Sequence, residues 1–208
     1  KDPKLFLVSA PSGAGKSSLI DAVLTSAKQS DLALELSISY TTRSPRKGES
    51  NGNQYFFISE EDFINKKNAN FFLEHAEVHG NWYGTSVDFV ESKLSSGINL
   101  ILEIDVQGFR QINELDIKYE SIFILPPSIY SLEERIKSRG DEDLEAINLR
   151  LKNAKDELAY ANEYKHIIIN DLFDDAEREL FKIIAQEKQL NREKTEEVQQ
   201  FLAQLLSY

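Results

Sequence analysis

A glycine-rich segment between an apolar run and a helix-compatible run constrains the fold more than any other feature. Residues 5–8 read Leu-Phe-Leu-Val, residues 9–18 read Ser-Ala-Pro-Ser-Gly-Ala-Gly-Lys-Ser-Ser, and an amphipathic stretch follows at once. Gly13 and Gly15 let the backbone curl so that successive N–H groups point inward, and the following helix adds the positive end of its dipole. Strand, glycine-rich turn, Lys-Ser and helix together predict a loop that cradles phosphate groups.

One position departs from the strict pattern of such a phosphate loop, because Ala10 stands where a first glycine is usual. An ordinary loop that caps a helix is the plain alternative. The remaining pattern, Gly-x-Gly-Lys-Ser-Ser between strand and helix, favours the phosphate site. In a loop of this kind Lys16 reaches the β- and γ-phosphates, and the Ser17 hydroxyl can ligate Mg²⁺.

The composition of the 208-residue chain indicates one substantial core with small appended subdomains. No apolar run is long enough to cross a bilayer, and no signal peptide is visible at the start of the sequence. Cysteine is absent, which excludes disulfides, thiolate zinc sites and cysteine nucleophiles and favours a cytoplasmic protein. The net charge of −11 argues against nucleic acid and membrane surfaces as partners. Any phosphate site is therefore expected to be a local basic pocket in an acidic protein.

Apolar runs alternate with helical patterns, which predicts an α/β fold with a mostly parallel sheet covered on both faces. The runs suited to buried strands are residues 5–8, 99–104, 121–125 and 166–169. The helical patterns cover residues 17–26, 87–96, 106–115, 129–138, 143–160 and a long stretch from residue 174. Ligands of such a sheet bind at the carboxyl ends of the strands, where the glycine-rich loop lies.

Two regions interrupt this alternation. Residues 39–86 are polar, aromatic and rich in turn residues, which predicts a small β-rich insertion. Residues 126–160 begin with Pro-Pro and carry dense charge, which predicts a helical excursion over the site.

A stripe of apolar residues near the C-terminus has helical spacing. It consists of Val198, Phe201, Leu202 and Leu205. The stripe is expected either to pack on its own domain or to form a contact in a homo-oligomer, and the sequence leaves both open.

A second candidate phosphate site is the most basic stretch of this acidic chain, residues 39–49. Arg43 and Arg46 lie three positions apart around a proline, among several hydroxyl side chains. Guanidinium forks grip phosphate oxygens at two points, and Tyr55 and Tyr83 can add phenolic donors. A solvated run of charge is the plain alternative for this stretch.

Further motifs occur in order between Leu5 and about residue 188. They are Ser-Ala-Pro-Ser-Gly-Ala-Gly-Lys-Ser (9–17), Ser-x-Thr-Thr-Arg-x-Pro-Arg-x-Gly-Glu (39–49), Tyr-Phe-Phe (55–57), Phe-Leu-Glu-His-Ala (72–76), Gly-Asn-x-Tyr-Gly-Thr (80–85), Leu-Glu-Ile-Asp-x-Gln-Gly (102–108), Phe-Ile-Leu-Pro-Pro-Ser (123–128), Arg-Gly (139–140) and Ile-Asn-Asp (169–171). In this combination the chain resembles the guanylate kinase family, in which alanine at the position of Ala10 is usual.

The resemblance implies three parts. They are a three-layer P-loop core with a parallel sheet of about five strands (residues 1–38, 87–125 and 161–208), a small β-rich GMP-binding subdomain (39–86) and a helical lid (126–160). It also implies transfer of the γ-phosphoryl of ATP to GMP or dGMP, with Mg²⁺ as cofactor, giving ADP and GDP in purine nucleotide metabolism.

The resemblance further implies roles for individual residues. The ATP phosphates are expected at Ala10, Pro11, Ser12, Gly13, Ala14, Gly15, Lys16, Ser17 and Ser18. The GMP phosphate is expected at Ser39, Arg43, Arg46, Tyr55 and Tyr83, and the guanine base at Glu74, Thr85 and Glu103, with Glu49 in support. Lys16, Arg43, Arg135, Arg139 and Arg150 are the expected catalytic residues. Arg139 and Asn170 are expected to contact ATP, and Ser17 and Asp105 to hold Mg²⁺ directly or through water.

The chemistry of guanine agrees with a carboxylate at position 74. Guanine offers its N1–H and its N2 amine as adjacent donors, and a carboxylate only accepts. AMP lacks both donors, and pockets built to hydrogen-bond a substrate reject analogues without the partner by about 10⁴–10⁵-fold. An exposed glutamate beside His75 is the plain alternative.

Two other functions compete with this reading. A small P-loop kinase for another acceptor, such as AMP, would prefer that acceptor in a nucleotide panel. A guanylate-kinase-like interaction module would bind partner peptides without turnover. Such modules have a degraded phosphate loop, whereas Gly13, Gly15, Lys16 and Ser17 are all present here.

Overall fold

The computed structural model describes residues 2–78, 80–138, 144–186 and 196–207. The chain divides into two compact units, each built from segments that are far apart in the sequence. The first unit comprises Lys1–Leu5 and Ala33–Tyr119, and the second comprises Phe6–Leu32 and Glu120–Tyr208.

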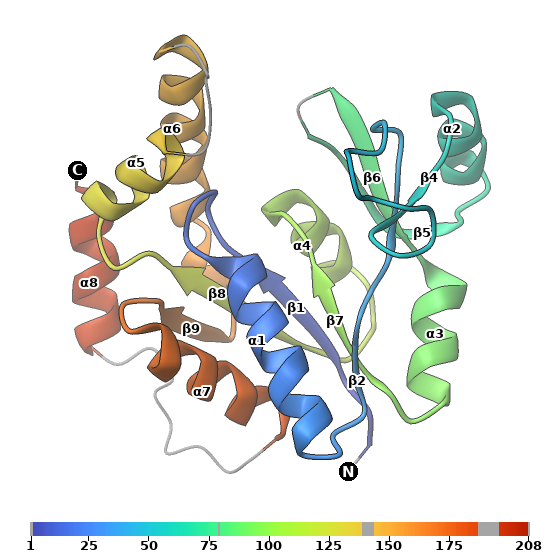
Figure 1. Ribbon diagram of the computed structural model, residues 1–208, viewed down its shortest axis with the longest axis horizontal. Helices are drawn as coiled ribbons and strands as arrows, with labels where there is room; N and C mark the ends of the chain where they lie inside the picture. The colour runs from blue at the N-terminus through green and yellow to red at the C-terminus, as the bar shows by residue number, and fades with distance from the viewer. Residues whose placement is uncertain (1, 79, 139–143, 187–195, 208) are drawn as a thin grey trace. The chain divides into compact units, whose positions relative to one another are not determined.

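The larger sheet has five parallel strands in the order β2-β7-β1-β8-β9 (Figure 1). The strands are β1 (Leu5–Ser9), β2 (Leu34–Leu36), β7 (Asn99–Glu103), β8 (Tyr119–Leu125) and β9 (His166–Ile169). Every residue of β1 is buried, as expected for a strand covered on both faces. The four strands expected from apolar runs are confirmed. The short β2 was not foreseen, because three residues carry too little periodicity.

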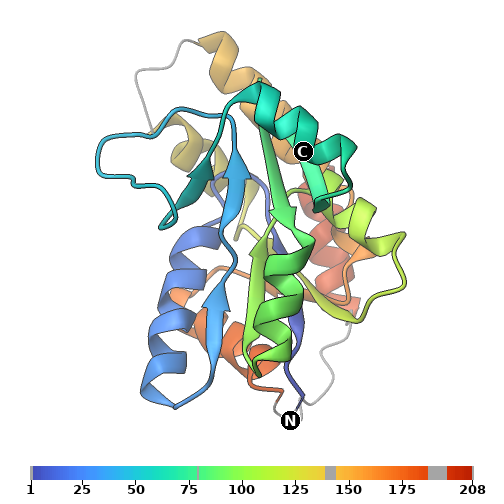
Figure 2. The same cartoon turned by 90° about the vertical axis from the view of Figure 1, so that its right-hand side faces the viewer.

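Helices of the second unit surround its part of the sheet. They are α1 (Lys16–Gln29), α5 (Ile129–Lys137), α6 (Leu144–Leu158), α7 (Phe173–Ile184) and α8 (Glu196–Leu206), with a 3-10 turn at Ala161–Glu163. Helices α1 and α7 lie side by side in both views (Figures 1 and 2), and the Ser26 hydroxyl donates to Glu177 Oε1 at 2.6 Å. The helical character expected for residues 126–160 is confirmed by α5 and α6.

The long C-terminal helical stretch is resolved into two helices within the described residues, α7 and α8. Val198, Leu202 and Leu205 of α8 are buried inside the chain, and α8 packs against α6. The stripe therefore packs on its own unit. An additional oligomer contact stays a prediction.

The first unit contains a four-stranded mixed sheet in the order β4-β3-β6-β5. Its strands are β3 (Ser39–Thr41), β4 (Tyr55–Phe57), β5 (Phe72–Val78) and β6 (Asn81–Ser86). Strand β3 pairs parallel with β4 and antiparallel with β6, and β5 forms an edge of the sheet. The β-rich insertion expected at residues 39–86 is thus observed.

Three helices accompany this sheet and the strands β2 and β7. They are α2 (Glu60–Asn68), α3 (Val87–Ser95) and α4 (Val106–Asn113). Helix α3 lies beside β7 (Figure 2), and α4 packs against β5. Helix α2 was not foreseen. Ser59 caps it by accepting a bond from the Asp62 N–H, and buried Phe63 stacks on Phe72 with ring centroids 4.4 Å apart.

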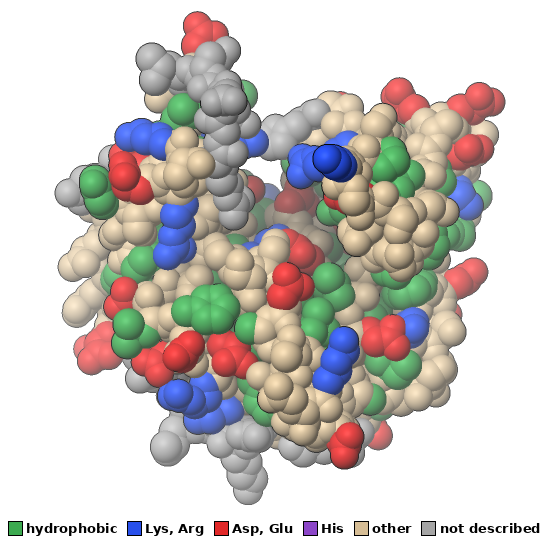
Figure 3. All heavy atoms as spheres, in the orientation of Figure 1, with side chains coloured by type: hydrophobic (Ala, Val, Ile, Leu, Met, Phe, Trp, Pro, Cys, Tyr) green, Lys and Arg blue, Asp and Glu red, His purple; other side chains and the backbone are tan. Residues whose placement is uncertain are grey.

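Carboxylate side chains, red in Figure 3, are spread over the face shown there, in agreement with the net charge of −11. Among the described residues, no helix has the length and apolar character needed to span a bilayer.

Candidate functional site

The glycine-rich loop joins β1 to α1 in the second unit. Gly13 and Gly15 have φ angles of 91° and 90°, which residues with a Cβ rarely adopt. Gly15 is the N-cap of α1, and the first turn of the helix contains no acidic residue. Because no side chain caps this end, the first N–H groups of α1 suit an anion.

Two side chains from other elements hold the carbonyl groups of this loop. Asn170, which is buried at the end of β9, donates through Nδ2 to the Ala14 carbonyl at 2.7 Å. Arg135 of α5 donates through Nη1 to the Gly13 carbonyl at 3.3 Å. A Cβ on Gly15 would collide with the Asn170 amide nitrogen, so glycine is required there for space as well as for conformation.

A pocket of about 330 Å³ opens beside the loop within the second unit. It is lined by Gly13, Gly15, Ser18, Arg135, Ser138, Asn170, Asp171 and Phe173. The structure thus brings five residues predicted for ATP binding or catalysis to one pocket. Ser138, Asp171 and Phe173 were not predicted as site residues. A single aromatic residue such as Phe173 at the start of a helix carries no signal of its own.

The other residues predicted around the ATP phosphates are distributed as follows. Lys16 is half-buried and Ser17 exposed in the first turn of α1, and Arg150 is half-buried on α6. Arg139 lies outside the described residues. Asn170 and Arg135 contact the loop itself, and their predicted contacts with nucleotide are untested.

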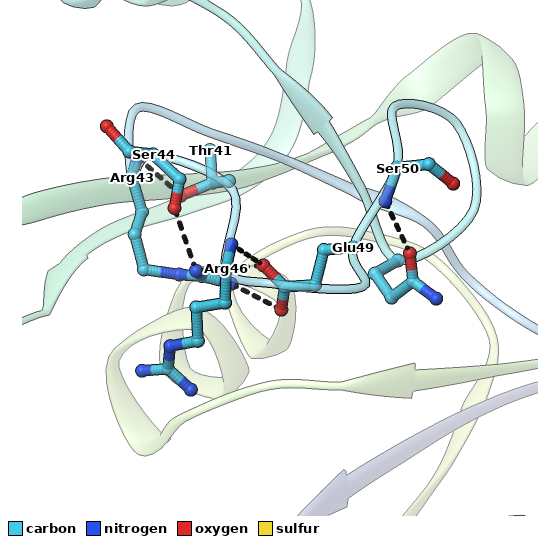
Figure 4. Close-up of polar contacts among 7 residues, drawn as sticks. Thr41, Arg43, Ser44, Arg46, Glu49 and Ser50 are labelled. Carbon is cyan, nitrogen blue, oxygen red and sulfur yellow. Dashed lines mark hydrogen bonds and ion pairs between the residues drawn. The ribbon is translucent and has the colours of Figure 1, made fainter.

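The basic stretch of the first unit is organised around Glu49 (Figure 4). Arg43 donates through Nη2 to Glu49 Oε1 at 2.9 Å and through Nη1 to Oε2 at 3.0 Å. The Arg46 backbone N–H also donates to Glu49 Oε2, at 2.7 Å, while the Arg46 side chain is exposed and points away from the carboxylate. The Arg43 guanidinium, followed by the Arg46 N–H, holds the pKa of Glu49 below its ordinary value. Glu49 therefore holds the Arg43 guanidinium and the Arg46 backbone.

Aromatic side chains complete this cluster. The Arg43 guanidinium lies 5.3 Å from the centre of the Tyr55 ring, and the Tyr55 and Tyr83 rings are 5.9 Å apart. Burial, and then the nearby charge of Glu103, raises the pKa of Tyr55. The cluster therefore combines four of the five residues predicted for the GMP phosphate with the supporting Glu49.

Glu74 is a buried carboxyl group, only 5% exposed, on β5. The Thr85 hydroxyl donates to Glu74 Oε1 at 2.6 Å, and the Ser39 hydroxyl lies 3.5 Å from that of Thr85. Burial raises the pKa of Glu74 to about 7, although the bond from Thr85 opposes the shift. A buried carboxyl group has lost its hydrogen bonds to water, and the donors of a bound base can replace them.

The charges of the two acidic residues at the end of β7 and in the following turn act on different titratable groups. The charge of Asp105 acts on Glu74 and raises its pKa further, whereas the charge of Glu103 acts on Tyr55. Glu74 Oε2 and Asp105 Oδ1 both lie beside Gly108, which places Asp105 near Glu74. The contact of Glu103 with guanine, which the resemblance implies, stays a prediction.

Ser17 and Asp105 are the side chains predicted for Mg²⁺. Asp105 is also the N-cap of α4, where its Oδ1 accepts from the Gly108 N–H at 2.8 Å. No group of three or more His, Cys, Asp or Glu side chains in the described part of the chain could hold a metal. Oxygen ligands without a protein cage suit Mg²⁺, which keeps water and substrate phosphates as ligands.

Comparison with known proteins agrees with these motifs. The family model described as guanylate kinase matches residues 2–187. Guanylate kinase of Hahella chejuensis is 49% identical over 185 residues, which cover 89% of this chain and 87% of that protein. Guanylate kinase of Pasteurella multocida is 43% identical over 204 residues, covering 98% and 97%.

A solved structure agrees as well. The crystal structure of guanylate kinase from Anaplasma phagocytophilum is similar with a TM-score of 0.69 at 27% identity, over 97% of this chain and 95% of that one. Family model, sequence relatives and fold all agree, and the chain therefore belongs to the guanylate kinase family.

Proposed function

We propose that this chain carries out the reaction of its family through the loop, the arginine cluster and Glu74 described above. The family's known reaction is the ATP-dependent phosphorylation of GMP. An oxygen of the GMP phosphate forms a bond to the γ-phosphorus of ATP, the bond from that phosphorus to the bridging oxygen breaks, and ADP leaves. The products are ADP and GDP, and dGMP is the expected second acceptor.

The glycine-rich loop and the arginine cluster bind the phosphates of different substrates. Lys16 and the N–H groups of residues 10–18 bind the ATP phosphates, and Arg43 and Arg46 with Ser39, Tyr55 and Tyr83 bind the GMP phosphate. Arg135, Arg139 and Arg150 stabilise the transferring phosphoryl group. Ser17 and Asp105 are the proposed oxygen ligands of Mg²⁺, which when bound neutralises charge on the ATP phosphates. No general base is needed, because the attacking phosphate oxygen is already ionised.

Glu74 supports the choice of GMP as acceptor. Its carboxylate accepts from the guanine N1–H and N2 amine, and Thr85 and Glu103 are the other proposed base contacts. Against AMP the same carboxylate would stay buried without these bonds, which is costly. The burial of Glu74 and its bond from Thr85 are the observations that carry this assignment.

Residues 39–86 form the GMP-binding subdomain and residues 126–160 the lid of a core formed by the rest. ATP and GMP are the partners, and the net charge of −11 disfavours nucleic acid and anionic membranes. A cytoplasmic location agrees with the absence of cysteine and with this choice of substrates.

A nucleotide panel tests the function. The purified protein is assayed with ATP and each of GMP, dGMP, AMP, CMP and UMP, with and without Mg²⁺, by a coupled measurement of ADP. We expect turnover with GMP and dGMP that requires Mg²⁺ and is lost in Lys16→Ala. Preference for AMP would overturn the assignment of Glu74. Turnover that persists in a folded Lys16→Ala protein would overturn the role of the loop.

A further inference from the structure

Helix α4 contacts strand β5 at the residues that flank and enclose the Glu74 carboxylate. Both elements belong to the first unit. The inference drawn from this contact rests on the proposed function, because it concerns how Glu74 is held for base recognition.

The side-chain amide of Gln111 in α4 forms hydrogen bonds with both the backbone N–H and the backbone carbonyl of His75, the residue after Glu74. The His75 N–H donates to Gln111 Oε1 at 3.0 Å, and Gln111 Nε2 donates to the His75 carbonyl at 2.6 Å. Strand β5 is an edge strand of its sheet, and both of these backbone groups bond to a side chain of α4. The side-chain amide therefore supplies the pairing that a further strand would supply.

The strand needs such a fixed point, because its pairing with β6 is irregular immediately before Glu74. Phe72 pairs with Ser86 and Glu74 pairs with Thr85, so that two steps along β5 match one step along β6. A bulge of this kind redirects the following side chains, and an edge strand is paired with another strand on one side only. Gln111 holds β5 one residue after the bulge, where a slip would turn Glu74 to the other face.

Gly108 of α4 provides the space that the carboxylate occupies. A Cβ at Gly108 would lie 2.6 Å from Glu74 Oε2, well inside van der Waals contact. Glycine is a poor helix former compared with alanine, and no positive φ requires it here. Close approach of the Glu74 carboxylate to the helix accounts for a glycine at this position.

We propose that Gln111 and Gly108 are positioning residues for base selection, which fix the Glu74 carboxylate through the β5 backbone and through space left in α4. Neither residue contacts the base. Gln111 sets the register and direction of β5, and Gly108 sets how deep the carboxylate lies. Thr85 Oγ1, 2.6 Å from Glu74 Oε1, completes a three-sided support for the carboxyl group.

The chemistry of two acceptors separates this role from a general effect on stability. Guanine presents two donors to the carboxylate, the N1–H and the N2 amine, whereas hypoxanthine in IMP presents only the N1–H. A displaced Glu74 loses the two-point contact with GMP and retains at most the one-point contact that IMP also makes. The ratio of kcat/KM for GMP to that for IMP therefore reports the position of the carboxylate.

Steady-state kinetics of two variants tests the proposal. Gln111→Met keeps the length of the side chain and removes both bonds to His75, and Gly108→Ala adds one methyl group against Glu74. We expect each to lower the GMP-to-IMP ratio by at least about tenfold, mainly through KM for GMP, with KM for ATP within about twofold. Gln200→Met, at an exposed position of α8, is the matched control and should leave all three quantities unchanged.

A pair of variants distinguishes failure of the inference from failure of the proposed function. Glu74→Gln alone should lower the GMP-to-IMP ratio, and Gln111→Met added to it should lower the ratio little further, since Gln111 acts through Glu74. An unchanged ratio in Glu74→Gln would overturn the base-reading role itself. A lowered ratio in Glu74→Gln but an unchanged ratio in both α4 variants would overturn only the inference. Thermal unfolding identifies folded variants, and Gly108→Ala decides the outcome if Gln111→Met does not fold.

Discussion

Glu74 is a carboxyl group that the fold removes from water, so its ionisation is coupled to folding and to base binding. Burial raises its pKa from 4.5 to about 7, with the charge of Asp105 adding to the shift and the Thr85 hydrogen bond opposing it. The ionised form accepts the two guanine donors, while the neutral form is the one that burial favours. The protonation state of Glu74 therefore determines whether its carboxylate can accept both guanine donors.

The stability of the substrate-free protein should depend on pH through Glu74. Below about pH 4.5 the group is protonated in both the folded and unfolded states and contributes nothing. Between pH 4.5 and about 7 only the unfolded state ionises, so the free energy of unfolding falls as the pH rises. The full loss above pH 7 is about 3–4 kcal/mol, at about 1.4 kcal/mol per pKa unit. Urea unfolding at a series of pH values should show this slope in the wild type and a flatter one in Glu74→Gln.

Glu49 should affect the KM for GMP through Arg43, which it holds by two hydrogen bonds. In Glu49→Gln the guanidinium loses its charged partner and its fixed direction. We expect KM for GMP to rise by about tenfold, the effect of one charge-assisted hydrogen bond, with KM for ATP unchanged. Glu61→Gln, an exposed position in the first turn of α2, is the control. An unchanged or lower KM for GMP in Glu49→Gln would show that Arg43 does not depend on this carboxylate.

At the scale of elements, the junction of β1 and α1 is the part that the sequence determines most directly. Only glycine readily takes the left-handed conformation at residues 13 and 15, and the apolar run before them can only be a buried strand in this context. The partners of the loop could not be foreseen, since Arg135 and Asn170 lie far along the chain.

The two constraints on Gly15 can be separated experimentally. In Gly15→Ala the new methyl group is attached to a left-handed backbone and collides with the Asn170 amide. In Gly97→Ala the backbone is also left-handed, but the space around the new methyl group is open. We expect Gly97→Ala to lose about 1–2 kcal/mol of unfolding free energy and to keep the wild-type KM for ATP. Gly15→Ala should lose more stability and raise KM for ATP. Equal effects of the two variants on both quantities would contradict a special role for the contact with Asn170.

The elements that were missed share a physical cause. Strand β2 has three residues, and α2 lies in a segment whose apolar residues serve an aromatic cluster rather than a helical stripe. Periodicity over so few residues does not distinguish helix from strand. Long periodic segments such as α1 and α7 were foreseen because each presents a full apolar face to the core.

For the whole molecule, burial of the C-terminal helix α8 should contribute directly to stability. Leu202 is 1% exposed, whereas Leu206 on the same helix is 47% exposed. Leu202→Ala should lower the free energy of unfolding by about 2–5 kcal/mol, because it leaves a cavity in the core. Leu206→Ala should change it by less than about 0.5 kcal/mol. Chemical unfolding of the two variants provides the comparison, and similar values for both would mean that α8 is not part of the stable core.

The sequence by itself determined the strand–loop–helix unit, the α/β class and the family, because these depend on local backbone chemistry and on motifs in a fixed order. Tertiary structure alone decided which groups surround each side chain: Glu49 around Arg43, Asn170 against the loop, and α4 against Glu74. The physical reason is that burial, pKa and hydrogen bonding depend on neighbours in space. Spacing along the chain fixes those neighbours only within a single element.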